Sequence, residues 1–223
     1  MKNRRLLMLF ATMAIPLFVF NVRSQSNPDE LPKFEVGAHF TSLTKPSFGS
    51  GHTAPGFGGR FTYNINETFA LEGVGNFFPG VCNGCGVVGD NSGTLVQGLG
   101  GVKIGKRFQK WGIFGKARAG VVSFSQGDGR FVITNPASPF GFDFERNRTN
   151  NFANDFGGIV EFYPTKRLVT RFEAGDTVIH YGQRSTNFIT FDPVTGAPSL
   201  IPFTIGPETR HNFQFSAGIG WRF

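Results

Sequence analysis

The sequence predicts an all-β fold, an eight-stranded antiparallel up-and-down transmembrane β-barrel with short periplasmic turns and long external loops. Three observations indicate it. Gly (31) and Phe (28) are abundant while charged residues make up 17%, below the roughly 25% usual in soluble domains. Segments throughout the chain alternate apolar and polar residues with a period of two, which is typical of strands. The connections between these segments alternate between short and long, as in outer-membrane barrels.

The first 24 residues are expected to be a signal peptide rather than part of the fold. A basic start is followed by an apolar run, Leu6 to Phe20, which is shorter than the roughly 20 residues of a spanning helix and fits a signal-peptide core. An uncleaved anchor helix is the alternative. We expect a short segment at 25–32 and a barrel domain at 33–223.

The net charge falls when the signal peptide is removed. The whole chain carries +7, but four of its 22 basic residues and none of its 15 acidic residues lie in the first 24 positions. The mature chain therefore has 18 basic and 15 acidic residues, a net charge of +3. Such a small excess gives no support for nucleic-acid binding.

Eight segments show the strand alternation, each with one apolar face and one polar, glycine-rich face. They are 33–43, 56–65, 69–78, 96–107, 111–124, 152–163, 167–181 and 211–223. The first, for example, places Phe34 and Val36 opposite Glu35 and His39. Short turns alternate with the long connections 44–55, 79–93, 125–151 and 182–210, an order that a soluble sandwich has no reason to adopt.

The polar faces carry bulky charged side chains, so we expect them to line the lumen while Phe, Val and Ile face lipid. A periplasmic lipocalin-like barrel with inward-facing Phe is the alternative. Buried charges must pair, so a salt-bridge network should plug the lumen; a charged pathway for solute or protons is the other interpretation. The expected network is Glu35, Arg60, Glu72, Lys103, Lys116, Arg118, Asp155, Glu161, Arg171, Glu173 and Arg222.

Two long connections contain alternating segments of their own. Residues 130–146 alternate around NPASP, and residues 187–205 alternate around DPVTG, which predicts β-hairpins that extend above the membrane. If both entered the wall, the barrel would have twelve strands, but their arms are shorter than the 9–11 residues that a tilted spanning strand needs. Their Phe side chains form either an external contact patch or a lid packed on itself.

Cys82 and Cys85 form a CNGC motif in a long external connection. We expect a local disulfide with Asn83-Gly84 as its turn, because the protein is exported. A redox site and a metal site are the alternatives; the first needs a thiolate at a helix N-terminus and the second needs further ligands.

Two other motifs are candidates for catalytic or cofactor sites. Gly100 to Arg107 resembles a phosphate-binding loop, but Arg107 stands where Ser or Thr should be and no helix follows, so we reject it. His180 and Ser185 lie near the external end of a strand without an evident third partner. We expect no catalytic residue, cofactor or metal, with lipid hydrolysis centred near His180 as an alternative.

The terminal segment FSAGIGWRF, with the eight strands and the order of their connections, resembles the small OmpA/OmpX-type outer-membrane β-barrels. The resemblance covers nearly the whole mature chain. It implies location in the outer membrane of a Gram-negative-type bacterium, contact with its lipid, and recognition by the barrel-assembly machinery through an insertion signal at Phe215, Ile219, Trp221 and Phe223. No peptidoglycan-binding domain follows, so an anchoring role is not implied.

The resemblance says little about activity, since its members include adhesins, channels, envelope anchors and lipid-modifying enzymes. We expect a structural or surface-interaction role, in which the external loops contact an unidentified ligand or partner and the lumen is plugged. A narrow channel for small or hydrophobic solutes and a lipid-modifying enzyme are the alternatives.

Overall fold

The structure is a computed structural model that describes residues 32–45, 52–79, 93–135 and 141–223. The expected signal peptide lies outside the described residues, as does the CNGC motif. In the part of the chain that the structure describes, no helix is long and apolar enough to cross a membrane. The described elements are all strands and their connections.

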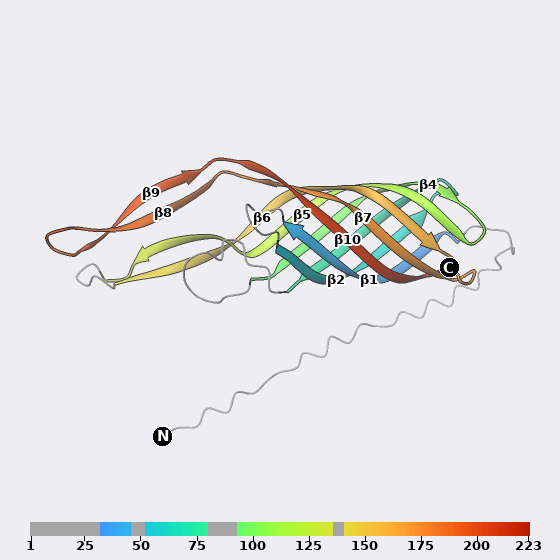
Figure 1. Ribbon diagram of the computed structural model, residues 1–223, viewed down its shortest axis with the longest axis horizontal. Coiled ribbons are helices and arrows are strands. Elements are labelled where there is room, and N and C mark those ends of the chain that lie inside the picture. Colours follow the sequence, from blue (N-terminus) through green and yellow to red (C-terminus); the bar gives the residue numbers. More distant parts are fainter. Residues whose placement is uncertain (1–31, 46–51, 80–92, 136–140) are drawn as a thin grey trace, which may run out of the picture. The chain divides into compact units, whose positions relative to one another are not determined.

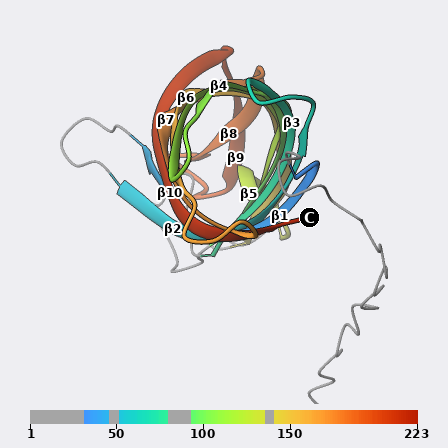
Figure 2. The same cartoon turned by 90° about the vertical axis from the view of Figure 1, so that its right-hand side faces the viewer.

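Eight strands form a closed antiparallel barrel, as the alternation predicted (Figure 1). They are β1 (Phe34–Lys45), β2 (His52–Asn64), β3 (Phe69–Phe78), β4 (Leu95–Arg107), β5 (Trp111–Ile133), β6 (Phe142–Phe162), β7 (Leu168–Tyr181) and β10 (Glu208–Arg222). The order around the barrel is β1-β10-β7-β6-β5-β4-β3-β2. Figure 2 looks along the barrel and shows the ring.

The first and last strands complete the ring. Val36 pairs with Trp221 and Thr44 with Phe213, and the backbone N–H of Phe34 donates to the carbonyl oxygen of Phe223 at 3.0 Å. A closed ring leaves no sheet edge with unpaired backbone groups, which is what hydrocarbon surroundings require.

The short turns lie at the end of the barrel where the chain terminates (Figure 1). In the β2–β3 turn the Asn66 side chain accepts the backbone N–H groups of Thr68 and Phe69, at 2.9 and 2.8 Å. Thr165 does the same for Arg167 and Leu168 between β6 and β7. Side-chain acceptors of this kind stabilise tight turns by satisfying backbone donors.

Two hairpins extend beyond the other end of the barrel, in agreement with the sequence pattern. β8 (Arg184–Phe191) and β9 (Pro198–Ile205) form a separate two-stranded sheet between β7 and β10, so the barrel has eight strands and not twelve. The turn at DPVTG is closed by hydrogen bonds from Asp192 N–H to Ala197 O and from Gly196 N–H to Asp192 O. Gly196 has a φ of 68°, a left-handed conformation that favours glycine.

The second hairpin is formed by the extensions of β5 and β6, and it corrects two expected strand boundaries. Residues 111–124 and 152–163 were expected to end near the barrel rim, but β5 and β6 continue as one antiparallel ladder to Ile133 and Phe142. The register shifts between Phe124 and Asp128. Such an irregularity lets a ladder bend and continue. The interrupted alternation at this point of the sequence predicts the end of a strand instead.

Candidate functional site

The lumen contains three layers of side chains, which follow one another from the short turns to the external hairpins. The layer nearest the turns is charged. All eleven residues of the expected network are buried and face the lumen. Ten of them form ion pairs within 4.0 Å, and Arg222 is the exception.

Glu72 on β3 accepts more described side-chain hydrogen bonds than any other carboxylate of the charged layer. Its Oε1 accepts hydrogen bonds from Arg118 Nη1 and Arg171 Nη2, both at 2.8 Å, and its Oε2 pairs with Arg171 Nη1. Arg118 also pairs with Asp155 and Glu173. These contacts link β3 to β5, β6 and β7 across the lumen, so they hold opposite walls of the barrel together.

Two further pairs flank this centre. Lys103 Nζ lies 2.6 Å from Glu161 Oε1, and neither side chain is exposed. Arg60 donates from Nε and Nη2 to the same oxygen of Glu35, at 3.2 and 3.1 Å. Breaking a buried pair of this type is strongly destabilising, because the remaining ion would be buried without its partner.

A layer of uncharged polar groups follows the charged layer, and the sequence analysis did not single it out. Asn76 donates from Nδ2 to Gln97 Oε1 at 2.6 Å, and its Oδ1 accepts from His39 Nε2 at 2.7 Å. Gln214 contacts Gln97, Thr41 and Thr177, which connects β10 to β4, β1 and β7. Alternation placed several of these residues on the lumen side, but their mutual contacts depend on how the strands are staggered.

The layer at the external end of the lumen is apolar, which corrects the expectation of a polar, glycine-rich lumen. Its buried members form one cluster, which comprises Leu43, Ala54, Phe78, Leu95, Leu99, Val122, Phe124, Ala153, Ile179 and Tyr181. Phe78, Phe124 and Tyr181 are the final lumen-facing residues of their strands or lie next to an irregularity. The sequence pattern therefore assigned them to strand ends, although the alternation already gave them the inward side.

Charged side chains lie over this apolar layer. The guanidinium carbon atoms of Arg184 and Arg210 lie 5.3 and 5.8 Å from the centre of the Tyr181 ring. Glu208 pairs with both, at 2.8 and 2.9 Å. Tyr181, a member of the apolar cluster, therefore has charged groups beside its ring at the external end of the barrel.

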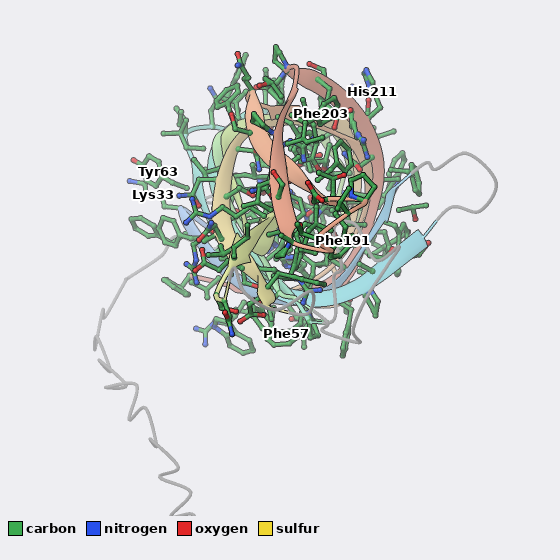
Figure 3. All side chains as sticks on the ribbon, turned by 90° about the vertical axis from the view of Figure 1, so that its left-hand side faces the viewer. Lys33, Phe57, Tyr63, Phe191, Phe203 and His211 are labelled. Carbon is green, nitrogen blue, oxygen red and sulfur yellow. The ribbon has the colours of Figure 1, made fainter. Side chains whose placement is uncertain are left out.

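The exterior of the barrel is apolar. Phe40, Phe57 and Ile219 are 78%, 55% and 60% exposed, and Figure 3 shows Phe57 on the outside of the ribbon. The expected insertion-signal residues Phe215, Ile219, Trp221 and Phe223 also lie on this exterior face. A barrel with charges inside and large apolar side chains outside has the surface of a membrane-spanning barrel.

The two external hairpins contact one another. Asn187 on β8 accepts the backbone N–H of Phe131 at 2.7 Å and donates to the carbonyl oxygen of the same residue at 2.9 Å. Thr186 donates to Gly129 O at 2.7 Å. These side chains satisfy backbone groups of β5 that no neighbouring strand pairs, so the hairpins are joined by polar contacts as well as by the rings of Phe142 and Phe191.

Large apolar side chains remain exposed on these hairpins. Phe188, Phe191, Ile201 and Phe203 are between 46% and 56% exposed, and Figure 3 shows Phe191 and Phe203 on the hairpin that faces the viewer. The hairpins also carry charges of both signs, including the exposed pair Arg130–Glu145 at 2.9 Å on β5 and β6. The expected Phe contact patch is therefore partly packed and partly open to the surroundings.

His180 lies on the outer face of β7, not in a cavity. It is hydrogen-bonded to Asn154 and Thr209, both at 3.1 Å, and its ring stacks on Phe152. No described contact joins it to Ser185, which lies on β8. Within the described ranges, no group of three or more His, Cys, Asp or Glu side chains is arranged to hold a metal ion.

No protein-family model and no curated protein sequence matches this chain. Its fold is similar to solved outer-membrane barrels. The attachment invasion locus protein Ail of Yersinia pestis has a TM-score of 0.48 at 14% identity, over 87% of this chain and 100% of Ail. Neisserial surface protein A has a TM-score of 0.48 at 12% identity, over 86% and 97% of the two chains. OprG of Pseudomonas aeruginosa has a TM-score of 0.39 at 9% identity, over 87% and 97%.

Proposed function

We propose that this protein spans the outer membrane of a Gram-negative-type bacterium as a closed barrel and that its external hairpins bind a partner at the cell surface. The observation that carries this proposal is the difference between the lumen and the external hairpins. The lumen is filled by ion pairs, amides and apolar side chains, while the exposed aromatic residues outside the barrel wall gather on two hairpins that contact each other.

The filled lumen supports a structural role over transport. A solute would have to separate ion pairs such as Lys103–Glu161 and then displace the apolar layer that includes Phe78 and Phe124. Both steps oppose permeation, because buried charges lose their partners and packed apolar groups lose their contacts. A narrow channel stays the second hypothesis, and bilayer conductance distinguishes the two.

The exposed hairpins support surface interaction. Aromatic and aliphatic side chains with a polar surround are typical of protein-binding surfaces. The edge strand β9 contains Pro198 and Pro202, and proline lacks the N–H that strand addition needs. We therefore propose that partners are bound through side chains such as Phe188 and Phe203 rather than by extension of the sheet.

A hairpin replacement tests this function. Residues 184–205 are replaced by a two-residue turn, and the variant is compared with the intact protein for binding to printed arrays of glycans and proteins. A heat-modifiable shift on gels first establishes that the shortened barrel is folded. We expect binding to be lost while the barrel remains.

The paired variant Phe188→Ser/Phe203→Ser should weaken the same binding, and Thr190→Ser serves as its matched control on β8. Equal binding by the intact and shortened barrels, or an intact barrel that binds nothing on the arrays, contradicts the proposal. The lipid-modifying alternative predicts instead that membrane lipids change when His180 is replaced.

A further inference from the structure

The charges at the turn end of the lumen do not balance. Among the described residues that face the lumen in the charged layer, the carboxylates are Glu35, Glu72, Asp155, Glu161 and Glu173. Each has a basic partner within 4.0 Å, and those partners are Arg60, Lys103, Lys116, Arg118 and Arg171. Arg107 and Arg222 face the same space and have no carboxylate partner.

Arg222 is the last residue of β10. It is 6% exposed, and its Nε–H is buried without a hydrogen-bond acceptor. Its guanidinium carbon lies 4.2 Å from the centre of the Tyr163 ring, which supports one face of the group and leaves its edge for an acceptor. A buried guanidinium edge with an unsatisfied N–H favours an anion strongly.

Arg107 is the last residue of β4. Its Nη2 donates to Asn64 Oδ1 at 2.5 Å, while its Nε and Nη1 are buried without acceptors. The Phe114 ring lies 5.5 Å from its guanidinium carbon. Both arginines are therefore held in place by neutral groups, and each keeps donors that no described residue satisfies.

The two guanidinium groups act on a common neighbour. Burial raises the pKa of the Tyr163 hydroxyl, as does the Glu161 carboxylate, while the charges of Arg107 and Arg222 oppose this increase. The hydroxyl donates to Glu161 Oε2 at 2.9 Å, and no described hydrogen bond joins it to either arginine. Arg107 ends β4 and Arg222 ends β10, so both charges lie at the turn-side mouth of the lumen.

Nearby carboxylates do not remove the excess of positive charge. Glu35 on β1 lies opposite Arg222 on β10 in the strand register. The Oε2 atom of Glu35 has no hydrogen-bond donor, so the Arg222 side chain can rotate towards it. Glu35 already neutralises Arg60, and Glu161 already binds Lys103. Rotation of a side chain redistributes hydrogen bonds but leaves two more basic groups than acidic groups in the layer.

We propose that the turn-side mouth of the lumen binds a small oxyanion, such as inorganic phosphate or sulfate, through the guanidinium groups of Arg107 and Arg222. The planar donor edge of arginine matches the geometry of oxyanions. This site lies at the opposite end of the barrel from the external hairpins, so it is independent of the surface-binding function.

The test uses the whole mature barrel in maltoside micelles, because this detergent brings no phosphate or sulfate. Phosphate is titrated against chloride at constant ionic strength, and the Nε–H signals of the arginines are followed by NMR. We expect the signals of Arg107 and Arg222 to shift saturably with phosphate, while those of Arg130, an exposed residue of the external hairpin, do not respond.

Variants then assign the site. Arg107→Gln and Arg222→Gln should each weaken phosphate binding by about tenfold or more, since each removes charge-assisted hydrogen bonds, and Arg130→Gln should leave it unchanged. The titration of the unmodified protein decides the matter if either lumen variant fails to fold. Shifts that do not saturate, or that chloride reproduces at equal ionic strength, overturn the proposal, as do equal affinities in the lumen variants.

Discussion

The Glu35–Arg60 pair offers a direct test of how the lumen is held together. Each residue has one described ion-pair partner, which is the other, and both side chains are at most 1% exposed. We consider Glu35→Gln, Arg60→Gln and the double variant as a cycle. Removing one member of a buried pair should lower the free energy of unfolding by about 3–5 kcal/mol, because an unpaired ion stays buried.

The structure predicts that the two single variants differ. In Arg60→Gln, the remaining Glu35 carboxylate can pair with Arg222, which lies opposite it in the register. In Glu35→Gln, no other described carboxylate lies within 4.0 Å of Arg60, so its charge stays unpaired. Glu35→Gln should therefore be the more destabilising change. The double variant should lose less than the two single changes together, with a coupling of about 2–3 kcal/mol.

Urea unfolding in detergent micelles, followed by tryptophan fluorescence and gel migration, measures these free energies. The matched control is the Arg130–Glu145 pair on the external hairpin, whose side chains are 57% and 48% exposed. Its cycle should give a coupling of about 0.2–1 kcal/mol, as is usual for exposed pairs. Equal couplings in the two cycles would refute the reasoning that burial makes the lumen pairs strong.

Three further predictions concern other parts of the molecule. Phe124→Ala should destabilise the barrel by about 3–5 kcal/mol because it opens a cavity in the apolar layer, and urea unfolding should show a smaller effect for the exterior Phe40→Ala. Backbone N–H groups of Thr195 and Val194 lower the pKa of Asp192, so its stabilisation of the hairpin turn is present at neutral pH and is lost as the pH falls through that lowered pKa. The NMR amide shifts of these two residues should titrate in the unmodified protein and stay constant in Asp192→Asn. His180→Ala should leave membrane lipids unchanged by mass spectrometry, because His180 contacts Asn154 and Thr209 but no described acid; a changed lipid profile would favour the enzyme hypothesis.

The sequence predicted the barrel because alternation is local. Phe34 and Glu35 are adjacent, and their opposite sides follow from the strand itself. The structure agrees in closing eight strands and in burying the charged face. The two hairpins were also predictable, since the DPVTG turn has residue types that a tight turn needs.

The contacts inside the lumen were not predictable from one sequence. Glu72 and Arg171 are 99 residues apart, and whether they meet depends on the stagger of the strands around the ring. The apolar layer was missed because Phe78 and Leu95 stand at strand ends, where a pattern gives few neighbours for comparison. Arg107 was placed on the polar face by alternation, but only the structure shows that its donors lack an acceptor.

Electrical recording in planar bilayers tests the closed lumen most directly. The ion pairs, the amide layer and the apolar cluster predict that the purified barrel gives no steady conductance. Steady channels in the unmodified protein that disappear in Arg60→Gln or Glu161→Gln would contradict this account, because they would place an open ionic pathway where the structure has paired charges.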